Sequence, residues 1–117
     1  TWGAMVHVAL KAAASAAKTG VEVEVVDLRT ISPFDARTCV DSVMRTGRLL
    51  VLQEAQWTGG LGNTVSSRIM EEAFWCLEVP PVVIGALDTP VPFSPTLEDH
   101  TMPTAELVYR HIERMCL

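Results

Sequence analysis

Most residues of this chain that could take part in chemistry gather in one segment, Arg48–Asn63, which reads RLLVLQEAQWTGGLGN. The apolar run Leu49–Leu52 leads to Glu54, a carboxylate that could act as an acid or base but has no His or second carboxylate near it in the sequence. The glycines could let backbone N–H groups approach an anion at a helix start. Their spacing is neither G-x-G-x-x-G nor a loop followed by G-K-[ST], so we expect tight packing or an interface rather than a nucleotide site.

The other reactive side chains are scattered. None of the three histidines has a second ligand type at helical spacing, and the three cysteines fit neither a disulfide framework nor a C-x-x-C metal half-site. We therefore expect no self-sufficient catalytic site, no metal site and reduced thiols. These residues are His7, His100, His111, Cys39, Cys76 and Cys116.

Composition narrows the class of protein. The chain has 117 residues, of which 49% are hydrophobic and 20% charged, as expected of one folded domain spanning residues 1–117. A formal net charge of -5 without a Lys or Arg run argues against nucleic acid as a partner. No apolar run approaches the roughly 20 residues that span a bilayer, so we expect no membrane insertion.

Hydrophobic periodicity predicts alternating helices and strands. An apolar stripe predicts a helix over 4–19, and alternation of Val with Glu predicts a strand over 21–25 with one solvent-facing side. The sequence S-P-F-D at 32–35 predicts the start of the next helix, and the continuous apolar run at 49–52 predicts a strand covered on both faces. The residues expected to face the core in the first two helices are Met5, Val8, Ala9, Ala12, Ala16, Ala36, Val40, Val43 and Met44.

The second half of the chain continues this alternation. A helix follows the glycines, two prolines end it at 80–81, and a short strand is expected over 82–84. Four prolines predict an extended connector over 88–103 without regular structure, and the last helix is expected from Thr104. The residues expected to face inward in these two helices are Val65, Ile69, Ala73, Trp75, Cys76, Val108, Ile112 and Met115.

The alternation predicts an α/β fold. We expect a three-layer αβα arrangement with a mainly parallel, doubly wound sheet and helices on both faces. The opening residues 1–3 stand directly before a helix, which is typical of the end of a βα turn. A strand is therefore expected before residue 1, and the chain is interpreted as a fragment of a longer polypeptide.

Two large aromatic residues lie in predicted loops, Trp57 beside the glycines and Phe93 among the prolines. Exposed aromatic side chains are often buried in subunit contacts, so we expect an oligomer interface at the carboxyl edge of the sheet. The alternative is that these loops fold back on their own domain, and sequence alone does not separate the two. The residues of this predicted interface are Glu54, Trp57, Gly59, Gly60, Gly62 and Phe93.

Several collinear motifs together resemble a known family. They are GAMVHVALKAA, VEVVDLRTISPFD, TGRLLVLQEA followed by TGGLG, EEAFWCLEVPPVV and DTPVPFSPTLED. The series is similar to the C-terminal domain of the β subunit of thiamine-diphosphate-dependent 2-oxoacid dehydrogenases, a relative of the transketolase C-terminal domain. The resemblance covers nearly the whole chain and implies the αβα fold, placed after a pyrimidine-binding domain. It also implies that the first central strand of the sheet, which lies just before residue 2 in this family, is lacking here.

The resemblance implies a noncatalytic role within a larger enzyme. In this family thiamine diphosphate and Mg are bound by other domains, between α and β subunits, so this domain is expected not to hold them. It would pair β subunits, contact the α subunit and help to dock the dihydrolipoamide acyltransferase core, for which Glu78 and the carboxylate of Leu117 are the candidates. The parent enzyme would decarboxylate a 2-oxoacid in the bacterial cytoplasm or the mitochondrial matrix.

One pattern favours a subtype of this family. The motif E-A-x-x-T-G-G at residues 54–60 looks more like branched-chain 2-oxoacid dehydrogenases than pyruvate ones, although many relatives have Pro where this chain has Gln56. Two alternatives stay open. The chain could belong to another transketolase-type thiamine enzyme, with both cofactor domains on one polypeptide, or it could be an independent flavodoxin-like module that binds a nucleotide or flavin alone.

Overall fold

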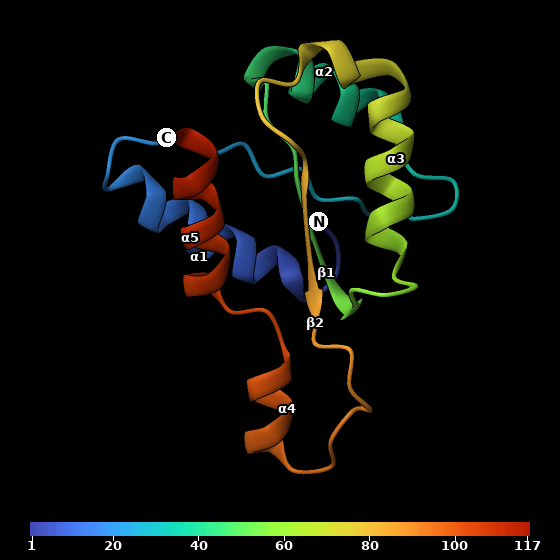
Figure 1. The fold of residues 1–117 in the computed structure, drawn as a ribbon, viewed down its shortest axis with the longest axis vertical. Coiled ribbons are helices and arrows are strands. Elements are labelled where there is room, and N and C mark those ends of the chain that lie inside the picture. Colours follow the sequence, from blue (N-terminus) through green and yellow to red (C-terminus); the bar gives the residue numbers. More distant parts are fainter.

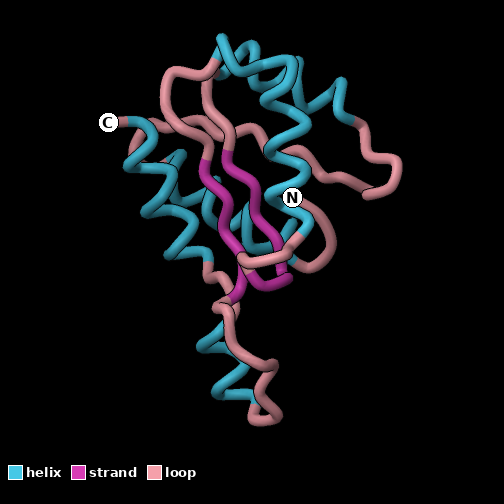
Figure 2. Tube along the Cα trace, turned by 45° about the vertical axis from the view of Figure 1, so that its right-hand side comes forward, coloured by secondary structure: helices cyan, strands magenta, loops and turns pink.

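Two parallel strands form the centre of the fold in the computed structural model, which describes all 117 residues (Figures 1 and 2). The strands are β1 (Leu50–Gln56) and β2 (Val82–Ala86). The predicted apolar run becomes the first half of β1, and Val51 and Leu52 are buried under helices on opposite faces. The paired residues are Leu50 with Val82, Val51 with Val83, Leu52 with Ile84 and Gln56 with Ala86, with a register shift after Leu52.

Helices cover both faces of the strand pair. In Figure 1, α1 and α5 lie on one side of the strands and α2 and α3 on the other. This layering and the parallel pairing confirm the predicted α/β class with helices on both faces, although only two strands are hydrogen-bonded. The helices are α1 (Met5–Ala17), α2 (Ala36–Thr46), α3 (Leu61–Ala73), the short 3₁₀ helix η1 (Phe74–Cys76), α4 (Pro95–Thr101) and α5 (Ala105–Cys116).

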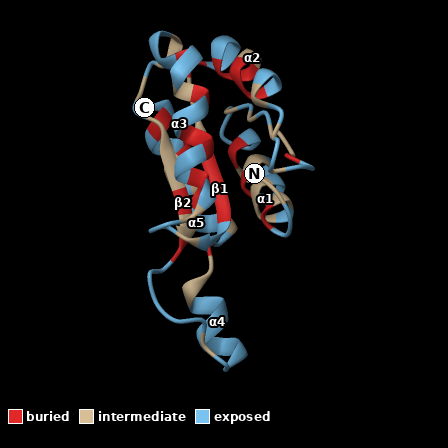
Figure 3. Ribbon diagram, turned by 90° about the vertical axis from the view of Figure 1, so that its right-hand side faces the viewer, coloured by how far each residue is buried: buried red, intermediate tan, exposed pale blue.

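Each face of the strands carries its own apolar cluster. The first, between α2, α3 and β1, is built around Val40, Val43, Val65 and Ile69, all of which are buried. Figure 3 shows that buried residues follow the strands and the inner sides of the helices. The second cluster, between α1, α5 and the strands, consists of Met5, Ala12, Ala16, Leu52, Ile84, Val108 and Ile112.

The predicted strand over 21–25 is wrong. This segment has no regular secondary structure and no partner strand, because the sheet contains β1 and β2 alone. It still lies between the helical layers, since Val21 and Val23 pack against the α1–α5 cluster while Val26 packs against the α2–α3 cluster. The alternating side chains therefore find apolar partners without a backbone ladder.

Two predicted helix limits need correction, and one is confirmed. The second helix begins at Ala36 rather than at the S-P-F-D sequence itself, because the Asp35 side chain caps it by accepting a hydrogen bond from the Thr38 N–H at 3.0 Å. The connector predicted to be irregular contains α4, which begins with a proline at its first position. The last helix starts as predicted after Thr104, whose hydroxyl accepts a hydrogen bond from the Leu107 N–H at 3.2 Å.

The predicted inward faces are buried or partly buried, with two exceptions, Met44 and Trp75. Met44 is 58% exposed because the buried face of α2 runs through Cys39, Val40, Ser42 and Val43 instead. Trp75, predicted to lie in the core, is 92% exposed, and Cys76 is only partly buried. Both lie in η1, where the chain winds with about 3.0 residues per turn and the phase of the helical stripe is lost.

Candidate functional site

The carboxyl ends of both strands meet at one edge of the fold, where two loops are tied together. The Trp57 N–H donates to the Ala86 carbonyl at 3.2 Å and so continues the strand pairing into the loop. Asp88 accepts two hydrogen bonds from Thr58, one from its N–H at 2.9 Å and one from its hydroxyl at 2.6 Å. The Gln56 side-chain amide donates to the Thr89 carbonyl. The loop after β1 therefore has a fixed position relative to the loop after β2.

The Asp88 carboxylate is held in its charged form by these contacts. Its hydrogen bonds from the Thr58 hydroxyl and then from the Thr58 N–H lower its pKa below the ordinary value. Sequence reasoning missed this pair because its members stand 30 positions apart. The pair links a charged group to the loop that carries Trp57.

The buried side chain of Gln53 holds the glycine loop in place through two hydrogen bonds. Gln53 is fully buried in β1, and its side-chain carbonyl accepts a hydrogen bond from the Gly62 N–H at 2.6 Å. Its amide group donates to the Gln56 carbonyl at 2.9 Å. A Cβ atom at Gly60 would lie 2.0 Å from the Gln53 amide nitrogen, and one at Gly62 would lie 2.9 Å from its oxygen. The glycines are therefore required where the chain passes over this side chain.

The hydrogen bond from Gly62 to Gln53 argues against anion binding by the glycine loop. The Gly62 N–H belongs to the first turn of α3, where an anion would be bound, but it already has Gln53 as its partner. Gly60 and Gly62 therefore allow close packing against Gln53. Gln53 itself was the available signal, because it is the one polar residue that follows directly on a continuous apolar strand pattern.

The predicted interface residues share this edge, with one of them on a projecting segment. Glu54 and Trp57 are exposed, Gly59 is exposed with a φ of 74°, and Gly62 is buried. Phe93 lies fully exposed in the segment that leads to α4, and Figures 1 and 2 show this segment and α4 extending beyond the strand ends. The structure thus exposes both aromatic residues, and their contact with a subunit stays a prediction.

Other apolar side chains are exposed at the same end of the molecule. Together with Trp57 they form the set that we call the edge surface, whose members lie in the loop after β1, at the start of α3, in the segment after β2 and in α4. A run of exposed apolar residues of this kind is unusual on a protein without a partner. The residues of the edge surface are Trp57, Leu61, Leu87, Val91, Phe93 and Leu97.

Of the two candidate docking residues, Glu78 pairs with Arg48, whereas Leu117 ends the chain just after α5. One guanidinium nitrogen of Arg48 is 2.8 Å from the Glu78 carboxylate, and another donates to the Met115 carbonyl at 2.8 Å, two residues before the chain end. Glu78 and Leu117 are both exposed. Arg48 therefore joins Glu78 to the last turn of α5, a link that the sequence did not reveal.

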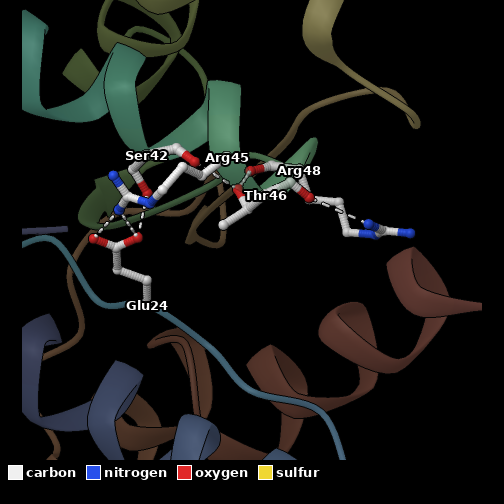
Figure 4. A network of polar contacts seen from close by, with 5 residues as sticks. All are labelled: Glu24, Ser42, Arg45, Thr46 and Arg48. Carbon is white, nitrogen blue, oxygen red and sulfur yellow. Dashed lines mark hydrogen bonds and ion pairs between the residues drawn. The ribbon is translucent and has the colours of Figure 1, made fainter.

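A second polar network fixes the extended segment over 21–26 to α2. Figure 4 shows the Glu24 carboxylate facing Ser42 and Arg45 of α2, whereas Arg48 extends away from this group. Glu24 accepts a hydrogen bond from the Ser42 hydroxyl at 3.0 Å and pairs with Arg45 at 2.5 Å. The hydrogen bond from Arg45, and then that from Ser42, lowers the pKa of Glu24. The network is a structural attachment rather than a set of groups aimed at a ligand.

The side chains that could ligate a metal ion are dispersed over this chain. No three of its His, Cys, Asp and Glu side chains come together as possible metal ligands. The three cysteines are free, and the pKa of buried Cys39 is raised by desolvation, which makes this thiol less reactive. None of the helices is both long and apolar enough to cross a membrane.

Comparison with protein families gives one match over most of the chain. The family described as "Transketolase, C-terminal domain" matches residues 1–108. A solved structure named "Split gene transketolase, inactive beta4 tetramer" has a TM-score of 0.81 and 28% sequence identity, over 97% of this chain and 37% of that one.

Curated relatives match at higher identity. The acetoin:2,6-dichlorophenolindophenol oxidoreductase subunit beta of Cupriavidus necator is 48% identical over 105 residues, which are 90% of this chain and 31% of that protein. The pyruvate dehydrogenase E1 component subunit beta of Bacillus subtilis is 49% identical over 94 residues, 80% of this chain and 29% of that protein. The corresponding subunit of Rickettsia bellii is 35% identical over 99% of this chain and 36% of its own length. The chain thus spans about a third of the curated relatives that it matches.

Proposed function

Because this chain belongs to the transketolase C-terminal domain family, we propose that it is the noncatalytic assembly domain of the β subunit of a thiamine-diphosphate-dependent 2-oxoacid dehydrogenase. The edge surface is the observation that carries the proposal, because it joins exposed apolar side chains to a rigid strand edge. Relatives named as β subunits of pyruvate and acetoin enzymes support the choice of subunit. The parent enzyme would transfer the acyl group to a lipoyl arm.

The edge surface has the composition of a subunit contact. Trp57 and Phe93 supply large apolar area, and aromatic residues are enriched where subunits bury each other. Glu54 lies exposed on the same strand end, so it is placed to meet a polar group at the rim. We expect the edge surface to contact a second β subunit and the α subunit.

The lack of a suitable donor set supports a noncatalytic role. The chain has no cluster of three possible metal ligands, and its glycine loop uses the Gly62 N–H for Gln53 rather than leaving it for a phosphate. These residues do not fit thiamine diphosphate with Mg. Both would be bound by other parts of the parent enzyme, which would supply the decarboxylation chemistry.

Docking of the dihydrolipoamide acyltransferase would use the group around Arg48. Glu78 and the Leu117 carboxylate offer negative charge, and the Arg48 guanidinium already neutralises part of it. A basic partner would therefore compete with Arg48 for Glu78, and its binding should weaken as salt rises. Glu78→Gln should weaken this binding, whereas Glu98→Gln, on the exposed α4, is the matched control. An unchanged affinity of the Glu78→Gln chain would remove this docking role.

The proposal extends to the substrate of the parent enzyme, a branched-chain 2-oxoacid. The E-A-x-x-T-G-G motif favours a branched-chain substrate, while the relatives compared above carry pyruvate and acetoin names. Steady-state rates of the assembled parent enzyme with pyruvate and with a branched-chain 2-oxoacid would decide between them. Preference for pyruvate would refute the branched-chain assignment and leave the assembly role intact.

A second candidate rests on the solved structure. The similarity to a split gene transketolase, with a TM-score of 0.81, favours the C-terminal domain of another transketolase-type thiamine enzyme. Its assembly role would be the same, but its parent would transfer a ketol group rather than an acyl group to a lipoyl arm. Transfer to free lipoamide by the parent enzyme would exclude this candidate.

The assembly role is tested by self-association of the chain. Sedimentation at rising concentration should show dimers or larger species, and Trp57→Ser combined with Phe93→Ser should abolish them. Trp75→Ser is the matched control, because this Trp is also exposed, at 92% against 51% for Trp57, but lies away from the edge surface, in η1. A chain that stays monomeric at millimolar concentration, or that loses association equally with the control, would refute the assembly role of the edge surface.

A further inference from the structure

The segment between β2 and α5 forms an arm, residues 87–101, that projects from the body of the domain. Figures 1 and 2 show it extending past the carboxyl ends of the strands, with α4 at its far end. None of the residues of the arm is buried, and Figure 3 shows α4 as exposed over most of its length. The arm therefore contributes no side chain to the two apolar clusters that stabilise the domain.

Hydrogen bonds at its base hold the arm in place. The Leu87 N–H donates to the Thr101 carbonyl at 3.0 Å, which joins the two ends of the arm. The next residue, Asp88, accepts the two hydrogen bonds from Thr58 in the loop after β1. Three prolines restrict the backbone further out. The arm is thus ordered without packing against its own domain, which lowers the entropy cost of binding a partner.

The arm combines large apolar side chains with negative charge. Val91 is 77% exposed, Phe93 is fully exposed and Leu97 is 56% exposed. Glu98 and Asp99 follow on α4, and the six ion pairs of the chain involve other carboxylates. The arm contains no Lys or Arg. Exposed apolar area beside unpaired charge of one sign is suited to a partner of the opposite charge.

A second copy of this chain lacks the complementary charge. The chain has a net charge of -5, and six of its nine Lys and Arg side chains already pair with its own carboxylates. The other three are Lys11 in α1, Lys18 at the end of α1 and Arg114 in α5. The arm of one copy would therefore meet mostly negative charge on another, which disfavours that contact.

We propose that the arm docks into an apolar groove rimmed by Lys and Arg side chains on a chemically different chain. The three apolar side chains of the arm fill the groove, and Glu98 and Asp99 pair with its rim. The proposal rests on the assembly function proposed above and defines the chemistry of one partner. Trp57, in the loop after β1, is left for the contact with a second β subunit.

Photocrosslinking in the assembled parent enzyme identifies what the arm touches. Phe93 is replaced by p-benzoylphenylalanine in the full-length β subunit, and the irradiated enzyme is digested and analysed by mass spectrometry. We expect a cross-linked peptide from a chain other than the β subunit, with Lys or Arg close to the point of attachment. The same replacement at Trp75, which is 92% exposed in η1, is the matched control and should not yield this peptide.

Removal of the charge on the arm tests the rim of the groove. β subunits with Glu98→Gln and Asp99→Asn together should bind the cross-linked chain about 2- to 30-fold more weakly at low salt, as expected for two exposed charge pairs. The difference should shrink as salt rises, because exposed charges are screened. Glu72→Gln, which removes an exposed carboxylate from α3, is the matched control and should leave the affinity unchanged.

Three results would overturn the proposal. The first is a cross-link from Phe93 to a β subunit, and the second is the lack of any cross-link, which would leave the arm in solvent. The third is an unchanged or tighter affinity of the doubly neutralised subunit, which would mean that the rim is not basic. A cross-link to a β subunit would leave the assembly role intact, whereas a chain that never self-associates would refute that role without affecting the docking of the arm.

Discussion

Replacing Gln53 with Met tests whether one buried amide holds the carboxyl edge together. Met keeps the length and unbranched shape of Gln, so the change removes hydrogen bonds with little change in volume. It leaves the Gly62 N–H without its 2.6 Å partner and the Gln56 carbonyl without its 2.9 Å partner. The first of these bonds is buried and the second partly buried, so the loss falls mainly on Gly62.

The magnitude follows from the cost of unsatisfied polar groups. A buried donor without an acceptor costs about 1–3 kcal/mol, and the partly buried carbonyl adds less because water can reach it. Burial of an apolar side chain in place of an amide offsets part of this loss. We therefore expect the free energy of unfolding to fall by about 1–3 kcal/mol, which lowers the melting temperature by roughly 4–12 °C in a domain of this size.

Thermal unfolding followed by circular dichroism measures the stability, and amide exchange locates the change. In the Gln53→Met chain, exchange at Gly62 should speed up more than exchange in the middle of α3. Glu54→Met is the matched control, because it places the same side chain at the next, exposed strand position and should change stability by less than about 0.5 kcal/mol. Equal stability of the Gln53→Met chain with Gly62 exchange unchanged would refute the role assigned to Gln53.

Three further predictions concern single residues. Gly60→Ala should lower the free energy of unfolding by about 1–3 kcal/mol, because its Cβ would meet the Gln53 amide at 2.0 Å, and urea unfolding would contradict this if stability were unchanged. Asp88→Asn should lower the melting temperature near pH 7. Since the folded pKa of Asp88 is lowered by Thr58, its contribution is fully present above the unfolded value of about 3.8 and is lost as pH falls through the lower folded pKa, so a difference that did not shrink below pH 3.8 would contradict this origin. Ile69→Ala should cost about 2–5 kcal/mol in chemical unfolding, because Ile69 is 1% exposed, and a smaller loss would mean that the α3 face is not the core.

Local patterns predicted the elements whose stabilising contacts are close in sequence. Thr104 caps the last helix through a bond three residues away, and the apolar stripe of α3 through Val65, Ile69 and Ala73 is buried as predicted. The prediction that Trp75 is buried was wrong, because the helix changes there from about 3.6 to about 3.0 residues per turn. Periodicity therefore predicts the buried face only as far as the helix type stays constant.

Contacts between distant residues were not predictable in the same way. The alternation at 21–25 predicted a strand wrongly, because a strand also needs a neighbouring strand at ladder distance and the sheet offers none to this segment. Arg48 joins Met115 across 67 positions, and Asp88 joins Thr58 across 30. A single sequence carries no signal for such pairs, because polar residues of these types occur equally on solvated surfaces.

The buried and exposed parts of the carboxyl edge depend on each other. An exposed Trp57 on a mobile loop would lose conformational entropy when a partner covers it, at a cost of about 0.5–1.5 kcal/mol per ordered side chain and more for the backbone. Here the loop is already ordered, since its N–H bonds to Ala86, its neighbour Thr58 bonds to Asp88, and Gln53 holds the start of α3. These bonds form when the domain folds rather than when a partner binds. Association at the edge surface therefore keeps most of the free energy gained from covering its apolar side chains.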